Sequence, residues 1–458
     1  MIVLWALGPP VVGWLLYMLR RHLLKVVVFF AALPAFLMKP VPFLVILALA
    51  LMARVTRPLW RPRFLRWNPR PLRAYRLRRW AKKSWPAVVQ LCDLVPQGGY
   101  VPPLKVVSTK DRLITRWTLP IGKTLSDVQH KLEPIGNSLG ATQVTVTQVM
   151  PGVVDLVWSR EDPLSSPDRA LMPEWGKTRC RDGVRLGRDE LGREIRWRPL
   201  SPPSHIVLAG GTRSGKSVAA MNLLNQFEMM PDVGVVGIDP TGILLAPFVR
   251  RFPDVPIVLG ATETDLIEGV KLLDDLVSFC MENRLEALRR ARMDALREVS
   301  PKTPLLLVVL EEWPGFLAAC AASDAANGRK PGERLKARAD MLVQRLLAEG
   351  LKVGMVVMIV AQRADADVLG GYRRAQISTR VAFRQEDAEG FRMLWPSAAE
   401  LGISGAGLRP GEGYASTPEG EVRRFRGDYL DYQTYYTRVA GVDEDELHPG
   451  QPELTAEV

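Results

Sequence analysis

The first stretch of the chain is almost wholly apolar. Met1–Leu19 carries no charged residue, and after the basic turn RRHLLK a second apolar run, Val26–Ala53, is broken only by Lys39 and three prolines. A bilayer crossing takes about 20 consecutive apolar residues. Residues 1–53 are therefore predicted to form a transmembrane anchor with two or three crossings.

From Pro103 onward the pattern changes to short β-rich runs. LKVVST and RLITRWTL are followed by a helical stretch at Leu125–Leu139 and then by TQVTVTQVM and VVDLVW. This succession predicts a small α/β domain at residues 84–165. Residues 166–203 are rich in proline and charge and are predicted to be a connector.

The next region begins with a strand, a glycine-rich loop and a helix. HIVLAG, at His205–Gly210, is a buried-strand pattern, and it runs directly into GGTRSGKS and then into the helical sequence VAAMNLLNQF. This order is the context that a phosphate-binding loop requires. Two further apolar runs, TPLLLVVL and VGMVVMIV, each end at polar residues.

The basic residues are concentrated beside the apolar start. The net charge is +12, and residues 54–83 alone hold twelve Lys or Arg and no acid, which equals the whole net excess. Under the positive-inside rule this basic juxtamembrane linker prefers the cytoplasm, and it suits anionic headgroups. The protein is therefore expected in the cell membrane, multi-pass, with the region after the linker in the cytoplasm; DNA binding by the linker stays open. Residues 84–458 hold 45 Lys or Arg against 49 Asp or Glu and end in a predicted acidic tail at 428–458. Any nucleic acid must therefore meet local basic patches in this part of the chain.

The loop Gly210–Ser217 has the spacing of a phosphate-binding loop. Gly210 and Gly215 permit backbone angles closed to other residues, so successive N–H groups can turn inward around phosphate oxygens at a helix N-terminus. Lys216 would pair with the β and γ phosphates, and the Ser217 hydroxyl would bind magnesium. ATP and Mg2+ are therefore the predicted cofactors. The residues predicted to bind them are Gly210, Gly211, Thr212, Arg213, Ser214, Gly215, Lys216, Ser217 and Glu311.

Two carboxylates follow the apolar strand pattern in TPLLLVVLEEWPGF. Carboxylates at the exit of such a strand lie beside the phosphate loop. We expect Glu311 to hold magnesium together with Ser217, and Glu312 to orient or deprotonate the attacking water. Gln362 closes the next apolar run, where it could sense the γ phosphate. Lys216, Glu312 and Gln362 are thus the predicted catalytic residues.

Together these motifs resemble the FtsK/SpoIIIE family of DNA translocases from Val184 to about Phe425. The matching segments, in order, are VRLGRDELGREI, SHIVLAGGTRSGKSVAAMNLL, GIDPTGILL, VVLEEW, AQRADADVLGG and ISTRVAFRQEDAEGFRML. A single motor behind a short anchor is most like the TraB-type transfer proteins of actinomycete conjugative plasmids and integrative elements. The resemblance implies an α/β fold with a RecA-like P-loop NTPase motor at residues 204–427. It also implies ATP-driven translocation of double-stranded DNA by a homo-hexamer, for conjugative transfer of a mobile element.

The chain departs from the family pattern at two positions. Glu311 stands where the family usually has aspartate, and Leu351 stands where an arginine acting across subunits is expected. Lys352, Arg373 and Arg380 are the candidates to replace that arginine.

Several other polar residues have open roles. Asp239 closes the apolar run VGVVGID and is either a functional carboxylate or a turn former. Two basic patches are candidate contacts for DNA phosphates. They comprise Arg289, Arg290 and Arg292, and Arg329, Lys330, Arg334, Lys336 and Arg338.

Two other functions stay open at this point. A secretion-type or coupling-protein ATPase would move protein or single-stranded DNA with a similar motor, although secretion ATPases commonly have several tandem motors. The second alternative is a nucleotide-binding membrane scaffold with little turnover, motivated by Glu311 and the missing arginine.

Overall fold

The computed structural model describes Arg79 and residues 82–443, apart from short gaps at 97, 109–112, 140, 142, 160–161, 364–369, 371, 386–388, 406 and 419. The predicted anchor at 1–53 lies outside the described residues, as do most of the basic linker and the end of the chain from 444. No helix in the described part is long and apolar enough to cross a bilayer.

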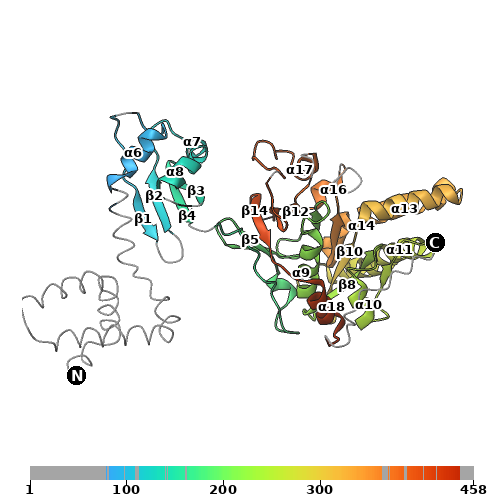
Figure 1. Ribbon diagram of the computed structural model, residues 1–458. Helices are drawn as coiled ribbons and strands as arrows, with labels where there is room; N and C mark the ends of the chain where they lie inside the picture. Colours follow the sequence, from blue (N-terminus) through green and yellow to red (C-terminus); the bar gives the residue numbers. More distant parts are fainter. Residues whose placement is uncertain are drawn as a thin grey trace, which may run out of the picture. The chain divides into compact units, whose positions relative to one another are not determined.

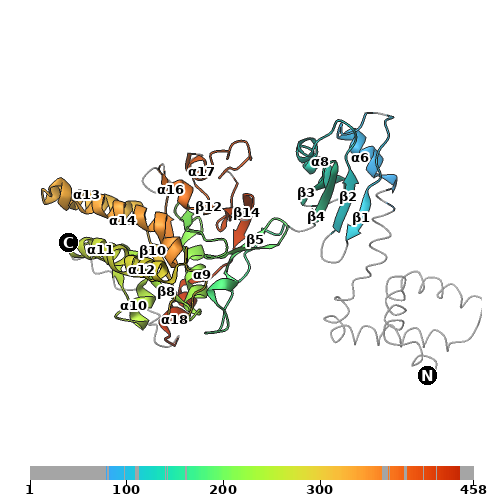
Figure 2. The same cartoon turned by 180° about the vertical axis from the view of Figure 1, so that it is seen from behind.

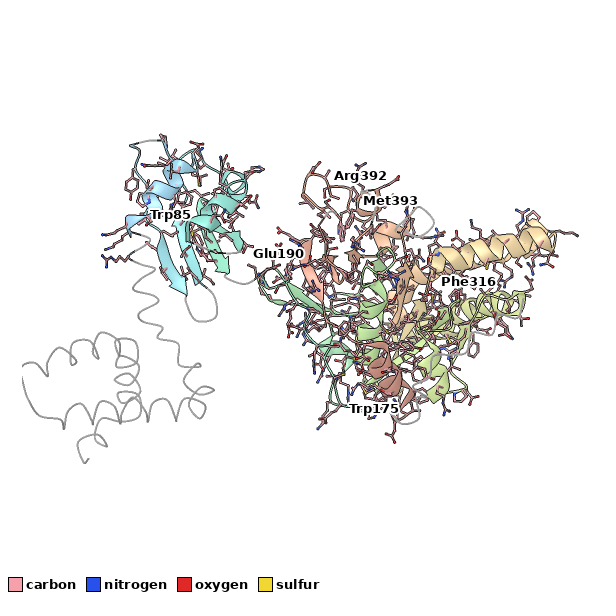
Figure 3. All side chains as sticks on the ribbon, viewed as in Figure 1. Trp85, Trp175, Glu190, Phe316, Arg392 and Met393 are labelled. Carbon is pink, nitrogen blue, oxygen red and sulfur yellow. The ribbon has the colours of Figure 1, made fainter. Side chains whose placement is uncertain are left out.

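A small α/β domain occupies the region after the basic linker (Figure 1). Its four-stranded antiparallel sheet has the order β1-β2-β4-β3. The core is built on Trp85, which is fully buried and packs edge-on against Trp117 at 5.2 Å between ring centroids (Figure 3). The elements are α6 (Trp85–Leu91), β1 (Lys105–Ser108), β2 (Leu113–Thr118), α7 (Leu125–Gln129), α8 (Leu132–Leu139), β3 (Gln143–Met150) and β4 (Val153–Ser159).

The motor is built on a ten-stranded sheet with the order β6-β5-β14-β13-β12-β7-β11-β10-β8-β9. The strands from β12 to β9 in this order are parallel, whereas β13, β14, β5 and β6 add on antiparallel. The strands are β5 (Val184–Asp189), β6 (Glu194–Trp197), β7 (Ile206–Ala209), β8 (Val233–Asp239), β9 (Ile257–Leu259), β10 (Leu305–Leu310), β11 (Met355–Ala361), β12 (Thr379–Phe383), β13 (Glu412–Ser416) and β14 (Arg423–Gly427).

Helices cover both faces of this sheet (Figures 1 and 2). They are α9 (Lys216–Glu228), α10 (Ala246–Arg251), α11 (Glu263–Asp275), α12 (Glu282–Ala291), α13 (Trp313–Ala326), α14 (Leu335–Glu349), α16 (Tyr372–Gln376), α17 (Glu389–Leu394) and α18 (Tyr432–Ala440). A π-helical turn, Leu276–Met281, joins α11 to α12, and shorter 3-10 turns lie at Cys180–Asp182, Pro331–Glu333 and Gly350–Val353.

The central strands are apolar without interruption because both of their faces are buried. Successive side chains of a strand point to opposite faces. In β7, Val207 and Ala209 join the core under α11, α13 and α14, where Phe316 packs (Figure 3). Ile206 and Leu208 join the core under α9, α10 and α18. The carboxyl ends of the parallel strands consequently meet at one edge, where their polar neighbours gather.

The connector predicted at 166–203 is in part a piece of the motor. Strands β5 and β6 lie within it, and β5 pairs with β14 through Phe425 and Asp189. The segment alternates as a strand does, since Val184 and Leu186 are buried while Arg185 between them is half-buried. The abundance of arginine made this alternation hard to recognise in the sequence.

The tail predicted at 428–458 likewise begins too early. Helix α18 packs against α9 and α10 (Figure 2). Its Tyr435 is fully buried, and the hydroxyl donates a 2.6 Å hydrogen bond to the Leu244 carbonyl. The motor therefore extends beyond the predicted 204–427 at both ends, since its β5 and β6 precede residue 204.

Candidate nucleotide-binding site

The predicted phosphate loop connects the end of β7 to the start of α9. Gly215 caps α9 with a φ of 105°, a conformation that L side chains rarely adopt. A Cβ at Gly215 would also lie 2.7 Å from the backbone nitrogen of Gly411. The Gly210 N–H donates to the Ala361 carbonyl at the end of β11, and Gly211 N–H donates to Arg384 after β12. Glycine is thus required at 215, and the neighbouring strands fix the loop.

The loop opens into a cavity of about 590 Å3 at the carboxyl edge of the sheet. Every predicted site residue lines it except Gly210, which is buried behind the loop, where a Cβ would meet the Ser214 hydroxyl. The lining residues are Pro167, Gly211, Thr212, Arg213, Ser214, Gly215, Lys216, Ser217, Val218, Ala219, Thr241, Glu311, Glu312, Gln362, Phe383, Pro410, Gly411, Arg426, Gly427, Asp428 and Tyr429. The sequence motifs thus converge on one volume, which suits a small-molecule ligand.

Lys216 and Glu312 form an ion pair inside this cavity. The Lys216 Nζ lies 3.2 Å from the Glu312 Oε2, and the lysine side chain is only 9% exposed. Glu312 has a φ of 40° and stands at the N-cap of α13, which directs it back toward the loop instead of along the helix. A bound triphosphate would offer Lys216 an alternative anionic partner.

Glu311 is half-buried beside this pair, and its Oε2 atom is buried without a hydrogen-bond partner among the described residues. Burial raises the pKa of Glu311 to about 7, and the nearby negative charge of Asp239 adds to the rise. An unpaired carboxylate oxygen is the hard ligand that Mg2+ prefers. Ser217 and Glu311 would hold that ion, and it would neutralise charge on the β and γ phosphates.

No cluster of three or more His, Cys, Asp or Glu that could hold a metal occurs among the described residues. Magnesium in phosphate-binding sites keeps several waters and takes one or two protein ligands together with the phosphates. The Ser217 and Glu311 pair fits that pattern and does not fit a cage made wholly of protein.

Asp239 is a turn former. Its Oδ1 accepts hydrogen bonds from the Thr241 and Gly242 backbone N–H groups and from the Thr241 hydroxyl, and its Oδ2 accepts one from the Leu245 N–H. These bonds build the loop after β8 and place Thr241 on the cavity wall.

Two of the three candidates to replace the missing arginine have side chains that are bound to groups of the same motor. Arg373 is 8% exposed and pairs with Asp340 at 2.6 Å. Arg380 donates to the carbonyls of Ile377, Leu394 and Arg374, and burial lowers its pKa. Lys352 is exposed on the 3-10 turn after α14.

Sequence motifs missed one side of the cavity. Pro167, Gly411 and Tyr429 line it but lie far from the phosphate loop in sequence. No local pattern marks these residues, because the pairing of β14 with β5 and β13 brings them to the site.

A phosphate loop at a helix N-terminus, a lysine within it and two carboxylates at the next strand's end define a P-loop ATPase. Residues 172–393 match the FtsK/SpoIIIE family. This segment therefore belongs to the FtsK/SpoIIIE family, as its motifs predicted.

The chain is similar to several named proteins. The DNA translocase FtsK of Borreliella burgdorferi is 26% identical over 278 residues, which are 56% of this chain and 31% of the relative. The transfer protein TraSA of Streptomyces ambofaciens is 29% identical over 310 residues, 64% of this chain and 69% of the relative. A solved structure of the pCW3 conjugation coupling protein TcpA, in monomer form with ATPγS, is 18% identical and aligns over 75% of this chain and 94% of its own, with a TM-score of 0.47. The chain spans about a third of the length of the first FtsK relatives it matches.

Proposed function

We propose that this chain is a membrane-anchored, ATP-driven translocase of double-stranded DNA that serves the conjugative transfer of a mobile element. One observation carries the proposal: within a segment of the FtsK/SpoIIIE family, the phosphate loop, both carboxylates and Gln362 line a single cavity.

The catalytic roles follow from the positions around that cavity. ATP places its phosphates on the loop, and Lys216 exchanges Glu312 for the β and γ phosphates. Glu312, freed from the lysine, orients or deprotonates the attacking water. Gln362 lies at the exposed end of β11 and senses the γ phosphate.

A helical hairpin links this chemistry to a basic tip. Helix α13 begins directly after Glu312 and runs for 14 residues, which is about 20 Å. It packs against α14, and the two extend from the sheet (Figure 1). At the tip, Lys330 and Arg334 are exposed. We assign DNA contact to these two cations and transmission of changes at Glu312 to α13.

Arg329, in the same patch, has a different role. Its guanidinium binds Glu263, Ser323 and Asp324, and its side chain is 16% exposed. It therefore braces the hairpin against α11 and is not available to DNA.

The remaining parts of the proposal rest on the sequence. Residues 1–53 anchor the protein in the cell membrane as a multi-pass segment, and the basic linker at 54–83 lies against cytoplasmic headgroups. The motors assemble as a homo-hexamer around the duplex.

The test is the ATPase activity of the full chain in detergent, with and without long duplex DNA. We expect several-fold stimulation by duplex. Lys330→Glu with Arg334→Glu should abolish the stimulation, leave basal turnover intact, and lower the salt slope of DNA affinity by about 2. The matched control is Arg289→Glu with Arg290→Glu, because both arginines already pair with Glu286 on α12.

If duplex DNA does not stimulate the ATPase activity of the assembled wild type, the proposal of a DNA translocase is contradicted. Filter binding of duplex DNA, single-stranded DNA and secreted proteins then separates the alternatives, because a coupling or secretion ATPase would prefer one of the last two.

A further inference from the structure

Two residues with ring side chains, Pro167 and Tyr429, line the cavity from outside the phosphate loop, and we call this pair its wall. Pro167 precedes the motor sheet, and Tyr429 follows β14; both line the cavity. Both are exposed, and Tyr429 keeps 54% of its surface accessible. A half-exposed aromatic ring on a cavity wall is a platform for another flat ring.

The backbone of this wall is held in place from both sides. The Tyr429 N–H donates to the Asp168 carbonyl at 2.7 Å, and the Ala170 N–H donates to the Tyr429 carbonyl at 2.9 Å. Arg185 of β5 forms ion pairs with the two residues next to the rings, Asp168 and Asp428. Pro167 and Tyr429 are therefore preorganised, and their rings are left free by these contacts.

A glycine path connects the wall to the phosphate loop. The Gly411 N–H donates to the Ser214 carbonyl at 2.7 Å, and the Gly427 N–H donates to the Gly411 carbonyl at 2.9 Å. Tyr429 lies two residues after Gly427. No side chain projects from the glycines between the loop and the wall, so one ligand can reach both.

We propose that Tyr429 and Pro167 form the nucleobase subsite of the cavity, with the Tyr429 ring stacked on the base of a nucleoside triphosphate. The proposal rests on nucleotide binding by the phosphate loop. Since that loop takes the phosphates, the base occupies the remaining apolar part. Stacking of a base on an aromatic side chain strengthens binding by about 5- to 150-fold.

The experiment compares two ligands, ATP and ribose 5′-triphosphate, which lacks the base. Their affinities for the full chain in detergent are measured by calorimetry with Mg2+. The wild type should bind ATP about tenfold more tightly. Tyr429→Ala should make the two affinities equal by weakening the binding of ATP alone, whereas Tyr429→Phe should keep the tenfold difference. Tyr372→Ala is the control, because Tyr372 is also 54% exposed but lies outside the cavity lining.

Three results would overturn the subsite. These are equal affinities of the two ligands for the wild type, an unchanged ratio in Tyr429→Ala, or the same loss in Tyr372→Ala. The ratio of the two affinities in the wild type tests the subsite even if Tyr429→Ala does not fold. If the wild type binds ATP but the ratio is absent, only the subsite fails; if it binds neither ligand, the ATPase proposal fails with it.

Discussion

Replacing Glu312 with glutamine tests the partner exchange of Lys216. The Lys216 ammonium is nearly enclosed and lies 3.2 Å from the Glu312 carboxylate. Glu312→Gln keeps the size of the side chain and removes its charge. Lys216 then remains buried without its ion-pair partner until a triphosphate supplies another.

The magnitude follows from the geometry of the pair. Two unit charges 3.2 Å apart attract by about 5 kcal/mol at an effective dielectric constant of about 20. The cost of removing both charges from water offsets most of this, so the net loss is about 1–3 kcal/mol. The ligand-free variant should lose that much stability. ATP no longer has to displace Glu312, so ATP should bind about tenfold more tightly, since 1.4 kcal/mol is a factor of ten.

The assays are denaturant unfolding without ligand, ATP titration and steady-state turnover. Turnover should fall at least about 100-fold, because the variant lacks the carboxylate that we propose activates the attacking water. The control is Glu349→Gln, which breaks an ion pair of similar length, 3.3 Å to Arg345, away from the cavity. The reasoning is refuted if Glu312→Gln binds ATP no more tightly than the wild type, or if the control behaves in the same way.

Two further predictions concern stability. Gly237→Ala should lower the free energy of unfolding by about 3 kcal/mol or more, because its Cβ would lie 2.1 Å from the Val309 carbonyl oxygen. The control Gly332→Ala, whose Cβ would meet nothing within 4 Å, should change that free energy by no more than about 0.5 kcal/mol. Equal effects of the two variants in denaturant unfolding would contradict the register of β8 on β10. Burial lowers the pKa of His205 from 6.5 to about 4, so its neutral form stabilises the fold above pH 6.5 and that contribution is lost as the pH falls toward 4. Between pH 7.5 and 5.5 the stability of the wild type relative to His205→Gln should therefore fall by about 1 kcal/mol, because all other titrating groups are common to both proteins. Relative to His130→Gln, a variant at an exposed histidine, the stability of the wild type should not change with pH; a constant difference between the wild type and His205→Gln would refute this.

The residues that the sequence identified are those whose role depends on near neighbours. A phosphate loop needs its glycines, lysine and hydroxyl within eight positions. Glu311 and Glu312 are recognisable because they directly follow an apolar run. The structure places these groups around one cavity because parallel strands end at a common edge. Short-range spacing and the geometry of a parallel sheet are therefore enough to predict which residues gather on this side of the cavity.

The other side of the site depends on pairings between distant segments. Tyr429 reaches the cavity because β14 pairs with β5, a strand that begins more than 230 positions earlier. Arginines such as Arg185 hold this arrangement, but an arginine-rich segment has the composition of a solvated connector, so the sequence did not identify it as part of the sheet. Asp239 shows the same limit at short range, because its four accepted hydrogen bonds depend on how the following loop folds.

The carboxylates also bear on the scaffold alternative. A buried carboxylate oxygen without a hydrogen bond costs stability, and Glu311 carries one beside a second acid. Glu311 has one methylene more than the aspartate expected there, yet it still lines the cavity with Ser217. A nucleotide that arrives with its cation supplies a partner for this oxygen, in an ATPase and in a nucleotide-binding scaffold alike. Turnover separates the two functions: an ATPase loses its turnover in Lys216→Ala and Glu312→Gln, whereas a scaffold has equal and negligible rates in the parent and in both variants.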